Sequence, residues 1–179
     1  MARSPYLEAK VNRWCKEKKE LVIDDCDPNT FTIIVDYMYG VAIPESLAIS
    51  ASDYSSSSLN DFKDADTMVS FCIDKLERVG KLLQMSDKLL IADLKRDVEE
   101  MLIKMLNGFD KSGVLFGGMM ILLAQMAEDY DCEKLLLAVA RRWVTHDFMK
   151  RMLKDQNNDW LKTKPQFMAA LLKAFAELP

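Results

Sequence analysis

The chain has 179 residues, of which 50% are hydrophobic and 29% are charged, and its 24 basic and 28 acidic side chains give a formal net charge of -4. This composition is typical of a globular protein with a core and excludes a disordered chain. The mild negative charge argues against nucleic acid as a partner, because nucleic-acid binding favours a basic surface. No apolar run approaches the roughly 20 residues that cross a bilayer, so we expect no membrane partner.

Cysteine usage bears on the compartment and on metal binding. The four cysteines are widely separated, at Cys15, Cys26, Cys72 and Cys132. No two of them have the spacing of a metal knuckle or a redox pair. The N-terminal residues also lack the apolar segment of a secretory signal. We therefore expect reduced thiols, no metal or cofactor, and a cytoplasmic or nuclear location.

The first predicted element is a helix over residues 5–19. It begins at Pro5, and Ser4 stands at the N-cap position. Its apolar side would consist of Tyr6, Leu7, Val11 and Trp14.

Residues 20–40 predict a short strand that leads directly into a helix. The apolar run at 21–23 is typical of a buried strand. Asp27 can cap the following helix, Pro28 fits its first turn, and Gly40 fits the left-handed turn after its end. One face of this helix is apolar because large side chains recur at helical spacing, at Phe31, Ile34, Val35 and Met38.

The next stretch, residues 41–67, predicts a break that contains a Ser-rich loop at about 45–67. Two helices should follow, from about Thr67 and then from about Ala92 to Leu106, and they form an antiparallel pair. Asn107 and Gly108 predict the end of the second helix, with a short linker after it.

Four more helices are expected in the remaining third of the chain. The first, at 114–130, is apolar on nearly all sides, which indicates burial between neighbours. Helices at 133–146 and 147–153 would follow. The last helix begins at Pro165, and its apolar positions are Phe167, Leu171, Leu172 and Phe175.

Residues 20–40 resemble the centre of the BTB/POZ domain. The resemblance lies in the acidic cap, the proline and the phenylalanine, and in the ending Asp-Tyr-Met-Tyr-Gly. Residues 82–106 resemble the helical hairpin that closes that domain, and residues 119–179 resemble BACK-type helices. The tail from Asp159 to Ala176 is most similar to the speckle-type POZ adaptors of cullin-3 ubiquitin ligases. The resemblance places the start of this chain after the hairpin and the dimer-interface helix that open the family domain.

This resemblance implies a mainly α, α+β fold with a short strand remnant. It divides the chain into an incomplete BTB/POZ domain at 1–107 and a BACK-like segment at 108–179. It also implies a protein–protein interaction module that docks on a cullin-3 scaffold as a substrate adaptor and self-associates as a homodimer. In the family the cullin contacts the end of the central helix, the loop after it and the first BACK-like helices. Carried over here, this marks Tyr37, Tyr39, Val41 and Ile43, with Leu47 and Met68 flanking the inserted loop. Self-association is assigned to Tyr6, Leu7 and Val11.

Two alternatives from the sequence stay open. Residues 108–118 contain no glutamate, although the family's cullin-selective segment carries one, and this favours a BTB scaffold without a cullin partner. A small helical enzyme is the other alternative, but no catalytic signature supports it and we expect no enzyme. A calcium loop is disfavoured too. Although Asp25, Asp27 and Asn29 have its spacing, Pro28 and Thr30 stand where the loop must bend.

Overall fold

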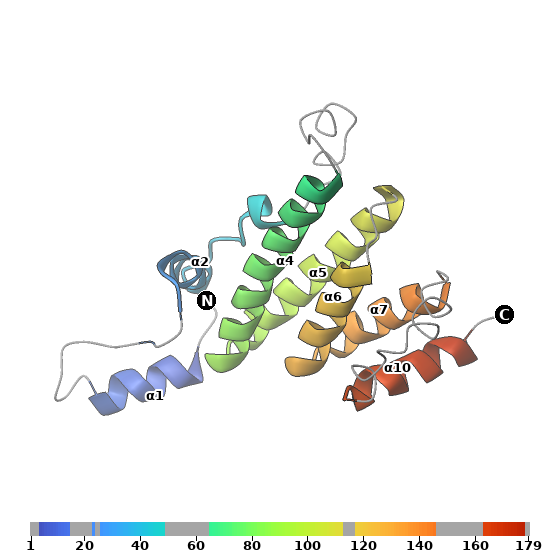
Figure 1. Cartoon of the computed structure of the whole chain (residues 1–179). Coiled ribbons are helices and arrows are strands. Elements are labelled where there is room, and N and C mark those ends of the chain that lie inside the picture. Colours follow the sequence, from blue (N-terminus) through green and yellow to red (C-terminus); the bar gives the residue numbers. More distant parts are fainter. Residues whose placement is uncertain are drawn as a thin grey trace.

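The computed structural model describes residues 4–14, 23, 26–48, 65–112, 117–145 and 163–177. Within these ranges the chain is mainly helical and has no strand. In chain order the described elements are the helices α1 (Pro5–Trp14) and α2 (Pro28–Met38), the 3-10 turn η1 (Glu45–Leu47), and the helices α4 (Ala65–Lys88), α5 (Ala92–Ser112), α6 (Gly117–Asp129), α7 (Glu133–Thr145) and α10 (Pro165–Ala176). Figure 1 shows α4, α5, α6, α7 and α10 following one another across the molecule, with α2 beside α4.

Helix α2 begins and ends as its sequence predicts. The Asp27 carboxylate accepts hydrogen bonds from the backbone amides of Asn29 and Thr30 at 3.1 and 3.0 Å, and a cap of this kind is worth about 1 kcal/mol. Gly40 follows the helix with φ +92°, a conformation that suits glycine. Ile34 is the fully buried member of the predicted apolar face, which packs towards α4.

Helices α4 and α5 form the predicted antiparallel pair and hold much of the core. Their facing sides bury Leu76, Val79, Leu83, Leu94, Val98 and Leu102. The turn between them places Leu90 at φ 55°, with its side chain exposed. The start of α1 contacts this turn, because Ser4 Oγ donates a hydrogen bond to the carbonyl oxygen of Leu89. Ser4 Oγ also caps α1, since it accepts a hydrogen bond from the Leu7 amide at 3.1 Å. The predicted Ser4 cap is therefore confirmed.

The predicted end of α5 at Asn107 and Gly108 is wrong, because the helix continues to Ser112 and includes the expected linker at 109–112. The Asn107 side chain is used elsewhere: its Oδ1 accepts a hydrogen bond from Arg142 Nη2 on α7 at 3.2 Å. A helical glycine costs only about 1 kcal/mol relative to alanine, so Gly108 does not suffice to end a helix that packs well.

Helices α6, α7 and α10 pack on one another, while α6 also packs on α4 and α7 also packs on α5. Two carboxylates cap the starts of neighbouring helices. Glu99 on α5 accepts from the Leu135 amide of α7, and Glu128 on α6 accepts from the Phe167 amide of α10, each at 3.0 Å. The rings of Trp143 and Phe167 meet edge to face with centroids 5.2 Å apart, which seals the contact between α7 and α10.

Several expectations lie outside the described residues. They are residues 20–22 of the predicted strand, the middle of the Ser-rich loop, and the short helix at 147–153. Ile23, the last residue of the predicted strand, is described and has no regular secondary structure. The loop expected at about 45–67 is shorter than predicted at both ends, because residues 45–47 form η1 and α4 already begins at Ala65. On α10 the predicted apolar set divides: Phe167 and Leu171 are buried, while Leu172 and Phe175 are exposed.

Candidate functional site: a groove between α2, η1 and α5

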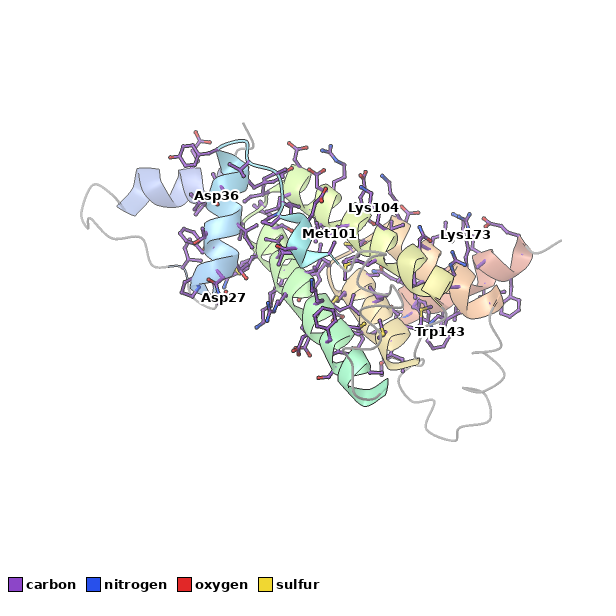
Figure 2. The ribbon with its side chains drawn as sticks, turned by 90° about the horizontal axis from the view of Figure 1, so that it is seen from above. Asp27, Asp36, Met101, Lys104, Trp143 and Lys173 are labelled. Atoms are coloured by element: carbon purple, nitrogen blue, oxygen red, sulfur yellow. The ribbon has the colours of Figure 1, made fainter. Side chains whose placement is uncertain are left out.

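A groove of about 540 Å³ lies where the segment after α2 passes along α5. Pockets that bind ligands commonly measure about 300–1,000 Å³. The groove is lined by Tyr37, Ala42, Ile43, Glu45, Ala48, Asp97, Glu100, Met101, Lys104 and Met105, and we call this set the α2–α5 groove. Figure 2 shows Met101 and Lys104 on the side of α5 that η1 approaches. Five of the lining residues are aliphatic or methionine, so the floor is apolar and the charges stand around it.

A hydrogen bond between α2 and α5 joins two of the residues that line the groove. The Tyr37 hydroxyl donates to Asp97 Oδ2 at 2.7 Å. The other carboxylate oxygen of Asp97 accepts two hydrogen bonds from Arg96, at 3.1 and 3.2 Å. Partial burial of the phenol, together with the hydrogen bond and charge of Asp97, raises the pKa of Tyr37 to about 12. The phenol therefore stays protonated, and the contact persists through the physiological pH range.

The η1 segment, which also lines the groove, is bonded to a lysine from α4. Lys75 Nζ donates to the carbonyl oxygen of Ser46 at 2.7 Å and to that of Ala48 at 3.4 Å. The same ammonium lies 5.2 Å from the centre of the Phe71 ring. A charged donor on the carbonyls of a short 3-10 turn fixes the position of that turn. Lys75 thus positions the η1 wall relative to α4.

Two exposed apolar side chains lie in the chain between the lining residues Tyr37 and Ala42. Tyr39 is 73% exposed and Val41 is 55% exposed. They flank Gly40, and the Val41 amide donates back to the Asp36 carbonyl at 2.9 Å, so the turn that carries them is hydrogen-bonded. Aromatic residues in such positions are enriched in protein interfaces. We use "docking surface" for the α2–α5 groove together with Tyr39 and Val41.

The structure brings some of the predicted partner-binding residues together. Tyr37 and Ile43 line the groove, and Tyr39 and Val41 are adjacent to it in the chain. Leu47 is half-buried and packs against the core, and the side chain of Met68 lies outside the described residues.

The residues predicted for self-association have a different environment. Tyr6 and Leu7 are half-buried and pack against the core, and the side chain of Val11 lies outside the described residues. Part of the apolar surface of Tyr6 and Leu7 is therefore already covered within the chain.

Sequence reasoning missed the contribution of α5 to the groove. The sequence pattern of α5 predicts a polar face that carries the acids near Asp97 and an apolar face that includes Met101 and Met105. Met105 is buried as expected, but Met101 is only half-buried and the two methionines form the groove floor together. The available signal was their spacing, because residues 97, 100, 101, 104 and 105 share one helical face that mixes acids with methionines.

The described residues offer no arrangement for metal binding. Within the described ranges, no three or more histidine, cysteine or acidic side chains gather closely enough to hold a metal ion. Both Asp27 oxygens are occupied as a helix cap, because Thr30 Oγ1 also donates to Oδ2 at 2.6 Å. Cys26, Cys72 and Cys132 are reduced and form no disulfide bond. None of the helices in the described ranges is long and apolar enough to cross a membrane.

Comparison with protein-family models, with curated proteins and with solved structures gives no match to this chain.

Proposed function

We propose that the chain is a protein–protein interaction module whose docking surface receives a partner. The observation that carries this proposal is that two exposed apolar side chains, Tyr39 and Val41, lie in the chain between residues that line a largely apolar groove. Exposed apolar area beside a preformed groove is typical of an interaction site. The hydrogen bonds of Tyr37 and Lys75 support the same role, since they fix the segments that line the groove before a partner arrives.

We further propose that the partner is a cullin-3 scaffold and that the chain acts as a substrate-adaptor fragment. The resemblance of residues 20–40 to the BTB/POZ centre supports this choice. In that family the cullin contacts the end of the same helix and the loop after it. These segments correspond to α2 from Tyr37 onwards and to residues 41–48, which contribute half of the groove lining.

A second candidate function is an oligomeric scaffold that binds no cullin. The absence of glutamate from residues 108–118 favours it, because the cullin-selective segment of the family carries that residue. In this case the chain would associate with itself, and its mass in solution would rise with concentration.

Calorimetric titration of the chain with the N-terminal region of cullin-3 tests the first candidate. Tyr39→Ala removes an exposed aromatic side chain from the docking surface, and aromatic anchors of this kind cost about 1–3 kcal/mol when truncated. We therefore expect this variant to bind between about fivefold and about 150-fold more weakly.

Leu172→Ala is the matched control, because Leu172 is 68% exposed on α10, away from the groove. It should bind like the unmodified chain. An unmodified chain that does not bind, or a Tyr39→Ala variant that binds equally well, would overturn the cullin proposal.

A further inference from the structure

The charges that line the α2–α5 groove are unbalanced. Three carboxylates line it, from Glu45, Asp97 and Glu100, against the single ammonium of Lys104. Asp97 is occupied by Tyr37 and Arg96. Glu45 and Glu100 are exposed, and neither forms an ion pair or hydrogen bond with another side chain in the part of the chain that the structure describes.

The lysine that contacts the η1 segment forms no ion pair with either of these acids in the described part of the chain. Lys75 directs its ammonium to the carbonyl oxygens of Ser46 and Ala48. The two unpaired carboxylates stand on different elements, Glu45 on η1 and Glu100 on α5, and both line the groove together with its apolar residues. The groove therefore offers apolar contact at its base and negative charge on both walls.

The shape of the α5 wall indicates which kind of segment fits. Its lining residues run from Asp97 to Met105 on one face, a length of about 12 Å or two helical turns. A helix face of this kind can pack against a second helix, with the ridges of one in the grooves of the other. A helix bound in this way contacts the groove through apolar side chains at positions i, i+3, i+4 and i+7. The side chains of Met101 and Met105 are flexible and adapt to the shape of the anchor.

We infer that the groove takes an amphipathic helix of a partner protein that carries lysine or arginine beside its apolar anchors. The inference rests on the proposed docking function and adds the chemistry of the ligand. The apolar anchors contact Ile43 and Met101, and the cations pair with Glu45 and Glu100. A helix with acidic flanks would place like charges against both walls and would gain contact only with Lys104.

Two fluorescein-labelled peptides of 16 residues test the inference by anisotropy titration. They share leucines at helical spacing and differ only at the flanking positions, where one has lysine and the other has glutamate, both good helix formers. We expect the lysine peptide to bind about tenfold more tightly at 0.1 M salt, since two partly exposed ion pairs replace two repulsive pairs. The preference should shrink at 1 M salt, where the Debye length is about 3 Å.

Chain variants assign the preference to the groove. Glu45→Gln with Glu100→Gln should abolish the difference between the peptides. Glu8→Gln with Glu77→Gln removes the same charge from exposed positions on α1 and α4 and should leave it unchanged. Equal binding of the two peptides, no binding of either, or an unchanged preference in the groove variant overturns the inference.

The peptides contain no cullin sequence, so this outcome is separate from that of the cullin titration. Sedimentation of the chain alone tests the other occupant of the groove, a second copy. A dimer that the Glu45→Gln and Glu100→Gln variant loses would show that the groove binds another copy, and would also overturn the inference.

Discussion

At the scale of single residues, Tyr37 joins two segments that are 60 positions apart in the sequence. Its hydroxyl donates to a carboxylate, and a hydrogen bond to a charged group contributes about 1.5–3 kcal/mol. Removing the phenol oxygen leaves Asp97 Oδ2 without this donor, but the Asp97 side chain is 39% exposed, so water can replace the donor and the net loss falls to about 1 kcal/mol.

Tyr37→Phe should therefore lower the free energy of unfolding by about 1 kcal/mol at pH 7, measured by urea denaturation. The pKa of Tyr37 is raised to about 12 in the folded chain, against an unfolded value of about 10. Its contribution is thus complete below pH 10 and is lost as the pH rises through 12.

The unmodified chain should consequently lose more stability than Tyr37→Phe between pH 10 and 12, so that the two converge. Tyr130 and Cys132, whose pKa values are also raised, are common to both proteins and cancel in the difference. A gap that stays constant with pH would mean that the Tyr37 hydroxyl does not hold α2 to α5.

At the scale of helices, carboxylates from neighbouring elements replace local caps. Lys164 stands at the N-cap of α10 and makes no side-chain cap there, and Glu128 on α6 accepts the Phe167 amide instead. Glu99 on α5 serves α7 in the same way. These hydrogen bonds connect the start of α7 to α5 and the start of α10 to α6. Each cap therefore also fixes the position of its helix relative to a neighbouring helix.

Glu128→Ala should lower the free energy of unfolding by about 1 kcal/mol, because it removes an N-terminal cap. Glu128→Gln is the matched variant, since its amide oxygen still accepts the hydrogen bond. Hydrogen exchange should show faster exchange at the first amides of α10 in the alanine variant only. Equal exchange in the two variants would show that Glu128 is not the cap.

The helices that could be predicted from the sequence are those whose signals are local. In α2 the cap of Asp27, the first-turn Pro28 and the left-handed Gly40 each act within one turn, and all three are confirmed. The end of α5 was missed because Asn107 bonds to Arg142, which lies 35 residues further along the chain. The α5 wall of the groove was missed for the same reason: the contact of Tyr37 with Asp97 is tertiary and leaves no local signal.

At the scale of the whole molecule, the core contains two of the described cysteines. Cys72 and Cys132 are buried, and burial together with the charge of Glu99 raises the pKa of Cys132 to about 12. The thiolate is the reactive form of cysteine, so a buried, protonated thiol reacts slowly. Cys26 is half-buried and exposes more of its surface.

Thiol labelling at pH 8 should therefore report global unfolding. In a Cys15→Ser variant, which removes the cysteine outside the described residues, we expect Cys26 to react with a disulfide reagent before Cys72 and Cys132. All three should react quickly in concentrated urea. Rapid labelling of Cys72 and Cys132 under native conditions would show that the α4–α5 and α6–α7 layers open more easily than their burial implies.

Function at this scale depends on whether the docking surface recruits a cullin-3 scaffold. Light scattering gives the solution mass of the chain alone and of its mixture with the cullin-3 N-terminal region. We predict a complex whose mass is the sum of its components in a defined ratio, and which Tyr39→Ala weakens while the helix content stays unchanged. Two species that keep their separate masses at every concentration would contradict the adaptor proposal.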